Sequence, residues 1–406
     1  MSLSAAIVTF SLVLYGGVVS LAVIWSRLAR HRLAGEAPYR PPLSVLKPMK
    51  GVDEDLEANL ESFARLDWPE LQILFAIADP TDPAVPVARR VAARHPEKDI
   101  QVIVGEEVIG RNPKVNLLHT LMHHARHDLC LISDSNVRAS QAYLEATVAP
   151  MRDPAVGLVS NPVVGVAEEG FAAAMENLHL SGFIACVNIA AKVLTGIETP
   201  VGKSMLFRKA ALSDMGGFRA VRNVLAEDNL IGVKMKEAGW RIVLSGHPVE
   251  NVNRRWSLRR FVERHGRWAR LRVWLAPWSY PLELVGNPVA LAAVFALLGA
   301  PSGFVLLGVA AGVKGALDGL ACLGLRGRLP RVHHLFAAPA KDLLLLWVWF
   351  VPFFSMDVNW RGNRLRLTRG TRLVRPQALS RARRIARGRL PVQNRSETEG
   401  PLDLAT

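Results

Sequence analysis

The sequence predicts an α/β domain held between membrane segments. Half of its 406 residues are hydrophobic and the mean hydropathy is positive, although 50 lysines and arginines against 35 acidic residues give a net charge of +15. An uncharged run precedes a block at 40–255 in which short apolar runs alternate with helical patterns, and long apolar runs return after residue 283. This combination is typical of a membrane protein with a basic face.

The first membrane segment is predicted at 1–30. Its uncharged stretch at 5–25 has about the length that a helix needs to cross the hydrocarbon core. Arg27, Arg30 and Arg32 follow the apolar stretch, whereas a signal peptide carries its cations in front of it, so we expect a retained anchor. The same arginines place the chain that follows them on the cytoplasmic side.

A second membrane region is predicted at 283–358. Its apolar runs are 284–298, 303–322 and 338–356, the first two forming a hairpin at Pro301. Arg326, Arg328 and Arg331 mark a cytoplasmic loop, yet three crossings would place the arginine-rich tail at 359–406 outside, against the charge rule. We therefore expect one run to be interfacial or re-entrant, and Lys341 and Asp342 point to the third.

The block at 40–255 reads as a mostly parallel sheet covered by helices. Strands are predicted at 44–47, 71–78, 100–104 and 129–133, with a helix at 56–66 and Pro48 ending the first strand. Ligands bind beyond the carboxyl ends of the strands in such sheets. Two of these ends carry an aspartate, Asp79 and Asp134.

Three carboxylates have both a functional and a structural interpretation. Asp79 and Asp134 suit nucleotide-sugar chemistry, because a leaving diphosphate needs a divalent cation or cationic side chains, and a carboxylate can orient uracil and ribose. Aspartate is also a common turn residue. Asp228 precedes a helix predicted at 230–238, where it is either a helix cap or the general base that takes the proton from an acceptor hydroxyl.

A basic aromatic stretch at 256–282 carries the fourth signal. Helical spacing places Arg264, Arg267 and Trp268 on one face, where two guanidinium groups can clamp a diphosphate beside an indole wall. An interfacial amphipathic helix with snorkelling arginines explains the same pattern. Both interpretations can hold, because a lipid acceptor requires a donor site beside the bilayer.

Seven short motifs, in order from about residue 41 to residue 367, resemble those of the ceramide glucosyltransferase family. These enzymes are inverting, GT-A-type transferases related to cellulose and hyaluronan synthases. The motifs are Leu46-Lys47-Pro48 with Lys50-Gly51, Ala78-Asp79-Pro80, Gly110 to Asn116, Ser133-Asp134-Ser135, Glu227-Asp228, the Arg-x-x-Arg-Trp segment at 264–268, and Trp360-Arg361-Gly362.

The resemblance implies a GT-A, Rossmann-like catalytic domain and a role for each motif. It assigns Asp79 to the donor nucleotide, Asp134 to the metal and diphosphate, and Asp228 to the general base. It assigns Arg264, Arg267 and Trp268 to the pyrophosphate and to the entrance of the acceptor site, and Lys114 to a phosphate. Mg²⁺ or Mn²⁺ is the implied cofactor, although Asn136 stands where many relatives have a second aspartate and is a weaker ligand.

The resemblance implies transfer of a hexose, with glucose as the leading candidate, from a UDP-sugar to ceramide with inversion at the anomeric carbon. The expected location is the cytosolic face of the bacterial inner membrane. A hopanoid-lipid N-acetylglucosaminyl- or glycosyltransferase is the close alternative. A non-catalytic membrane scaffold is the third interpretation, and the intact Asp228 and arginines argue against it. No nucleic-acid partner is expected, because zinc-finger, RNA-binding and helix-turn-helix patterns are absent from the sequence. The oligomeric state stays open.

Two further motifs suggest other chemistry. Gly202-Lys203-Ser204 resembles the end of a phosphate loop, but five residues separate Gly196 from Gly202 where that loop has four. His123, His124 and His127 suggest a metal site, but they end a predicted helix without clear companion ligands. We interpret them as cations at a helix end.

Overall fold

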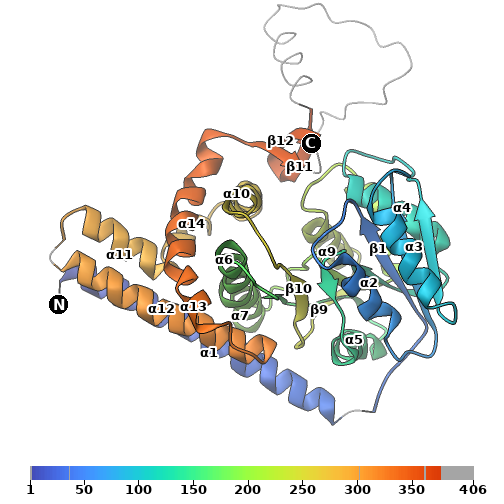
Figure 1. The fold of residues 1–406 in the computed structure, drawn as a ribbon, viewed down its shortest axis with the longest axis horizontal. Helices are drawn as coiled ribbons and strands as arrows, with labels where there is room; N and C mark the ends of the chain where they lie inside the picture. The colour runs from blue at the N-terminus through green and yellow to red at the C-terminus, as the bar shows by residue number, and fades with distance from the viewer. Residues whose placement is uncertain (1, 36, 301, 361–362, 376–406) are drawn as a thin grey trace, which may run out of the picture.

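A computed structural model describes residues 2–35, 37–300, 302–360 and 363–375, and it places an α/β domain beside a group of long helices (Figure 1). The main sheet consists of β1 Leu43–Met49, β2 Leu71–Ile77, β3 Asp99–Val104, β4 Leu129–Ser133, β6 Val156–Ser160, β8 Ser204–Arg208 and β9 Arg241–Leu244. Its order is β3-β2-β1-β4-β8-β6-β9. Only β8 runs antiparallel to its neighbours, so the prediction of a mostly parallel sheet is confirmed.

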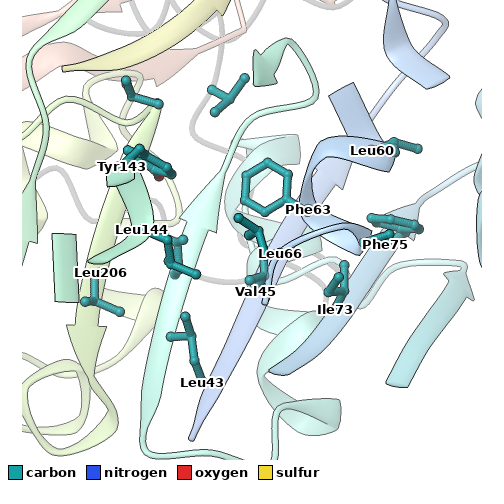
Figure 2. Packing of buried hydrophobic residues seen from close by; sticks show 14 of the residues in the cluster. Leu43, Val45, Leu60, Phe63, Leu66, Ile73, Phe75, Tyr143, Leu144 and Leu206 are labelled. Carbon is teal, nitrogen blue, oxygen red and sulfur yellow. The ribbon is translucent and has the colours of Figure 1, made fainter. Parts of the chain in front are cut away.

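Helices cover both faces of this sheet. They are α2 Leu56–Ala64, α3 Ala84–Arg94, α4 Pro113–His124, α5 Gln141–Val148, α8 Lys209–Asp214 and α9 Glu227–Glu237, with short 3₁₀ turns at Ala149–Arg152 and Phe218–Val221. Because successive strand residues point to opposite faces, β1 contributes Val45 to the core under α2, α3 and α5, and Leu46 to the core under α4, α8 and α9. Figure 2 shows Val45, Phe63 and Phe75 in the first of these cores.

The sheet brings the predicted strand ends to one edge. β1 lies between β2 and β4 and runs parallel to both, so Lys50, Asp79 and Asp134 follow neighbouring strands. The prediction that Pro48 ends the first strand is wrong, because β1 continues to Met49. Pairing with β4 stops at Leu46, so the missing N–H of Pro48 lies beyond that ladder.

Two smaller sheets complete the α/β part. One contains β5 Val137–Arg138, β7 Val163–Val166 and β10 Val249–Val252, and the other contains β11 Asp357–Trp360, β12 Asn363–Thr368 and β13 Arg372–Val374, with a 3₁₀ turn at Arg369–Thr371. The second small sheet includes the start of the expected basic tail. It joins the segment before α9, since Leu225 N donates to Thr371 O at 3.0 Å and Leu373 N donates to Asn223 O at 2.8 Å. Residues 361–362 of the last family motif and 376–406 of the tail lie outside the described residues.

The remaining helices form the apolar part of the molecule. They are α1 Leu3–Ala34, α6 Phe171–His179, η2 Leu180–Ala185, α7 Cys186–Thr195, α10 Leu258–Leu275, η4 Pro281–Leu284, α11 Pro288–Leu297, α12 Gly303–Arg326, α13 Val332–Leu335 and α14 Ala337–Phe354. In the described part of the chain, four stretches are long and apolar enough to cross a membrane, namely Leu3–Ala34, Phe171–Thr195, Gly303–Arg326 and Val332–Phe354. The chain is therefore membrane-associated.

These helices differ from the predicted segments in two respects. Phe171–Thr195 lies inside the block that was expected to be the α/β domain, although half of its most apolar window is buried. The first C-terminal run forms α11, whose ten residues extend about 15 Å against a hydrocarbon core of about 30 Å. By its length, the run that is too short to cross the hydrocarbon core is therefore the first one, α11, and not the third. Pro301, the expected break between α11 and α12, lies outside the described residues.

The charges in the third run lie in a buried ionic quartet formed by Lys314, Asp318, Lys341 and Asp342. Lys341 Nζ is 3.0 Å from Asp318 Oδ2 and 2.7 Å from Asp342 Oδ1, and Lys314 Nζ is 2.9 Å from Asp318 Oδ1. Tyr15 of α1 donates its hydroxyl to Asp318 Oδ1 at 2.5 Å. The quartet joins α12 to α14 and is neutral as a whole, so Lys341 and Asp342 do not require α14 to lie at the interface.

Candidate active site

A cavity of about 420 Å³ lies beyond the carboxyl end of β4, bordered by α9 and α10. Its cationic lining residues are Lys50, Lys114, Lys203, Arg260, Arg264 and Arg267, and its carboxylates are Asp53, Asp134, Glu227, Asp228 and Glu263. Lys114, Asp134, Asp228, Arg264, Arg267 and Trp268, which the sequence singled out, all line it. Asp79 does not.

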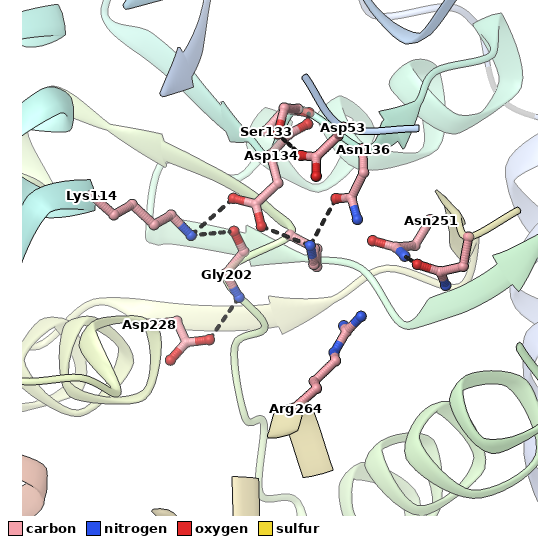
Figure 3. Close-up of polar contacts among 12 residues, drawn as sticks. Asp53, Lys114, Ser133, Asp134, Asn136, Gly202, Asp228, Asn251 and Arg264 are labelled. Carbon is pink, nitrogen blue, oxygen red and sulfur yellow. Dashed lines mark hydrogen bonds and ion pairs between the residues drawn. The ribbon is translucent and has the colours of Figure 1, made fainter. Parts of the chain in front are cut away.

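Asp134 is held between two ammonium groups at the end of β4. Lys114 Nζ is 3.0 Å from its Oδ1 (Figure 3), and Lys203 Nζ is 2.9 Å from its Oδ2. Burial alone would raise the pKa of Asp134, but the two lysines outweigh burial and hold the pKa below its usual range. Asp134 is therefore ionised and its charge is compensated.

Lys114 is positioned by the start of α4. Asn112 caps this helix, because its side-chain oxygen accepts from Lys114 N at 2.9 Å and from Val115 N at 3.2 Å. The ammonium group donates to Gly202 O at 2.9 Å and lies 3.3 Å from Glu227 Oε1. Burial would lower the pKa of Lys114, but Asp134, Glu227 and Asp228 together raise it above its usual value. A permanent cation thus stands beside the strand end.

Asp228 lies in the first turn of α9 and is partly exposed. Its Oδ2 accepts from Gly202 N at 2.8 Å, on the other side of the peptide segment that receives Lys114 (Figure 3). The N-cap of α9 is Ala226, so Asp228 does not cap the helix in the usual way. Its neighbour Glu227 is buried, and burial together with the charge of Asp228 raises the pKa of Glu227 despite the opposing effect of Lys114.

The basic face of α10 also borders the cavity, and its arginines lie close to aromatic rings. The guanidinium carbon of Arg264 lies 4.5 Å from the ring centre of Trp268 and 5.2 Å from that of Trp256. Arg264 Nη1 is also 3.1 Å from Glu176 Oε1, and His265 Nε2 is 2.7 Å from Glu176 Oε2. Because Glu176 is fully buried on α6, it fixes the position of Arg264 from the helical part of the molecule.

Asp79 lies at the same edge of the sheet but outside the cavity lining. It is separated from Asp134 by β1, or by about 10 Å across the strands. Its Oδ1 accepts from Thr81 N at 2.8 Å and from Thr81 Oγ1 at 2.7 Å, and these bonds lower the pKa of Asp79. Its observed contacts are those of a turn aspartate.

Sequence reasoning missed Lys203. Gly202-Lys203-Ser204 is not a phosphate loop in the structure either, because Ser204 begins strand β8 and not a helix. Lys203 nevertheless lines the cavity, contacts Asp134 and donates to Asn136 Oδ1 at 2.8 Å. A lysine directly in front of an apolar strand was the available signal. Trp256 and Arg260 were also missed, although both lie at the edge of the basic aromatic stretch.

Comparison with known proteins gives one family. The family model described as Glycosyl transferase family 21 matches residues 8–373. Ceramide glucosyltransferase 3 of Caenorhabditis elegans is 28% identical over 258 residues, which are 63% of this chain and 56% of that protein. Ceramide glucosyltransferase of Candida albicans is 36% identical over 118 residues, which are 26% of this chain and 22% of that protein. The chain thus spans a little over half of the length of the nematode relative.

Among solved structures, a mannosyltransferase from Pyrobaculum calidifontis, in complex with GDP-Man and Mn²⁺, aligns with 83% of this chain and 99% of its own, at 20% identity and a TM-score of 0.48. The family model covers nearly the whole described chain. This protein therefore belongs to glycosyl transferase family 21, which confirms the resemblance that its motifs predict.

Proposed function

We propose that this chain transfers a hexose, glucose first among the candidates, from a UDP-sugar to the hydroxyl of ceramide, with inversion at the anomeric carbon. One observation carries the proposal. A partly exposed carboxylate, Asp228, lines the same cavity as the cations Lys114, Lys203, Arg264 and Arg267. A general base and a cationic site for a leaving diphosphate are the two elements that this transfer requires.

In the proposed reaction Asp228 takes the proton from the acceptor hydroxyl. The hydroxyl oxygen forms a bond to the anomeric carbon from the face opposite the diphosphate, and the bond between that carbon and the diphosphate oxygen breaks. Gly202 N–H, at 2.8 Å from Asp228 Oδ2, orients the carboxylate. Each carboxylate oxygen has two lone pairs, so one remains on Oδ2 for the hydroxyl.

The departing UDP gains negative charge. The cations of the cavity stabilise this charge. Lys114 and Lys203 lie on either side of Asp134, while Arg264 and Arg267 come from α10. Guanidinium groups bind phosphate oxygens in a bidentate manner. Asp79, at the same edge of the sheet, contacts the nucleotide in this proposal.

Asp134 would hold Mg²⁺ or Mn²⁺. Its carboxylate and the amide oxygen of Asn136 are the oxygen ligands that these ions prefer, and a cation held by one protein carboxylate completes its shell with substrate phosphates and water. Lys114 and Lys203 contact both oxygens of Asp134, and Lys203 also donates to Asn136, so an ion would bind here only when these lysines turn toward the donor diphosphate. When bound, the ion would neutralise charge on the diphosphate.

The neighbouring apolar helices support a lipid acceptor. α10 packs against α14 and α6, so the cavity lies beside Phe171–Thr195 and Val332–Phe354. We propose the cytosolic face of the bacterial inner membrane as the location, because the arginines after the first segment lie on the cytoplasmic side by the charge rule. A hopanoid lipid satisfies the same geometry and is the competing acceptor.

Product analysis tests the proposal. The purified protein in lipid nanodiscs is incubated with UDP-glucose, UDP-galactose or UDP-N-acetylglucosamine, each against ceramide and against a hopanoid polyol, and lipids are identified by mass spectrometry. We expect hexosylceramide with UDP-glucose. Product on the hopanoid alone would show that a hopanoid, and not ceramide, is the acceptor. Absence of product with every pair would overturn the proposed transfer.

The role of Asp228 is tested separately. Asp228→Asn should abolish transfer while UDP binding, measured by calorimetry, stays near that of the wild type. Glu237→Gln, an exposed change near the end of the same helix, is the matched control and should retain activity. Normal turnover in Asp228→Asn would refute the assignment of the base.

A further inference from the structure

A second group of possible ligands lies on α4, outside the cavity. Glu107 is in the loop between β3 and α4, and His119 and His123 are one helical turn apart on α4. Glu107 Oε1 is 3.4 Å from His119 Nε2, and Glu107 Oε2 is 3.4 Å from His123 Nε2. One ligand atom from each residue can be chosen so that all three lie within 4.8 Å of one another.

These separations suit a small tetrahedral cation. Zn²⁺ bonds to imidazole nitrogen and carboxylate oxygen at about 2.0–2.2 Å, so two ligands of a tetrahedral ion lie about 3.3–3.5 Å apart. Both contacts between imidazole and carboxylate are already at 3.4 Å. The remaining separation lies within 4.8 Å, so rotation of the exposed Glu107 and His123 side chains would close the three ligands onto one ion.

The backbone holds the three residues in place. Histidines at positions i and i+4 face the same side of a helix, and here the two rings meet edge to face at 4.9 Å. Glu107 N donates to Thr120 Oγ1 at 2.9 Å, which fastens the loop to α4. Nε2 of His119 is buried without a hydrogen-bond partner among the described residues, so this nitrogen is available to a ligand.

One cation already contacts the carboxylate. Arg219 Nη2 is 3.0 Å from Glu107 Oε1, and its side chain is mostly exposed. Oε2 faces His123 and is left for a metal, because a carboxylate offers about four lone-pair positions. The sequence placed His123 with His124 and His127, whereas the structure places it with His119 and Glu107.

We propose that Glu107, His119 and His123 bind a divalent transition metal ion, Zn²⁺ in the first place, with water in the fourth position. Two imidazoles and one carboxylate favour Zn²⁺ over Mg²⁺, whose ligands are oxygens, so this site is chemically distinct from Asp134. The loop that carries Glu107 continues to Asn112, the cap of α4. The ion ties this loop to the helix that presents Lys114, and it does not take part in sugar transfer.

Metal titration tests the site with a readout other than activity. The full-length protein in detergent is stripped with a chelator, titrated with Zn²⁺ by calorimetry, and titrated with Co²⁺ by visible absorption. We expect one tetrahedral ion per chain, and His119→Ala and His123→Ala should each weaken binding about tenfold or more, which is about 1.4 kcal/mol. Glu107→Gln should weaken it in the same direction.

The controls separate this site from other ligands. His124→Ala changes an exposed neighbour on α4 and should leave the affinity unchanged, and Asp134→Asn should leave it unchanged because Asp134 belongs to the cavity. Absence of binding, or binding that His119→Ala and His123→Ala do not weaken, would overturn the proposal. Either result is independent of the proposed sugar transfer. Circular dichroism establishes that each variant is folded.

Discussion

The main-chain N–H of Gly202 donates to Asp228 Oδ2 at 2.8 Å, and the carbonyl of the same residue accepts from Lys114 Nζ at 2.9 Å. One glycine therefore sets the positions of the proposed base and of a proposed diphosphate cation. A side chain at this position would contact both groups, because a Cβ would lie 3.0 Å from Asp228 Oδ2 and 3.0 Å from Lys114 Nζ.

Gly202→Ala should lower kcat by about tenfold or more, since overpacking of this kind costs about 1–3 kcal/mol and here displaces the base. Steady-state kinetics with UDP-glucose and ceramide measure the effect. Gly308→Ala, on the exposed side of α12 with open space around the new Cβ, is the control and should be active. Wild-type kcat in Gly202→Ala would show that the Gly202 contact does not hold the base.

Arg267→Ala should raise KM for the UDP-sugar by roughly 10- to 100-fold, because a hydrogen bond to a charged group contributes about 1.5–3 kcal/mol. Arg267 lines the cavity on the same helical face as Arg264. KM is measured at saturating acceptor, with Arg89→Ala, an exposed arginine of α3, as the control. An unchanged donor response would remove Arg267 from the diphosphate clamp.

Glu176→Gln should weaken donor binding without a direct contact to the donor. Glu176 is fully buried and its carboxylate lies 3.1 Å from Arg264 Nη1, so neutralising it removes the charge that positions the guanidinium group. We expect a rise in KM for the UDP-sugar of about tenfold with a smaller change in kcat. Glu176→Asp, which retains the charge, should restore part of the affinity. Equal loss of kcat in both variants would indicate a purely structural role.

Lys47 should make stability depend on pH. Burial lowers the pKa of its ammonium group to about 7, against about 10.4 in an unfolded chain. Between these values the unfolded chain binds a proton that the folded chain has lost, so the free energy of unfolding should rise with pH by up to about 1.4 kcal/mol per pH unit.

Thermal unfolding in detergent at several pH values between about 7 and 9 measures this effect. Lys47→Met removes the titrating group but leaves a chain of similar length beside Phe63, whose ring centre is 3.9 Å from Lys47 Nζ. The variant should show a smaller increase of Tm with pH than the wild type. Identical slopes would exclude Lys47 as the titrating group.

The parallel strands and their ends were predictable because buried strands are short, apolar and followed by polar turns. β1 to β4 lie within two residues of the predicted limits, and Asp134 lies where the strand pattern places it. The helical spacing of Arg264, Arg267 and Trp268 likewise predicted a common face, and all three line one cavity.

Contacts between distant segments could not be predicted in this way. Lys203 meets Asp134, and Glu176 meets Arg264 across 88 positions, because tertiary packing and not local periodicity brings them together. The small C-terminal sheet was hidden by its charge. In β12 arginines alternate with Leu365 and Leu367, which are buried, so the sequence predicts a basic tail where the structure has an alternating strand.

The ionic quartet has a consequence for how the protein enters the membrane. Lys314 and Asp318 neutralise each other on α12, and Lys341 and Asp342 do so on α14, so each helix can enter the hydrocarbon without a net charge from these residues. The contact between Lys341 and Asp318 forms only when the two helices meet, and Tyr15 of α1 donates to the same carboxylate, so the quartet joins three helices. A chain with Asp318 replaced by leucine would leave Lys314 and Lys341 to share the single carboxylate of Asp342, with one positive charge uncompensated between the two helices.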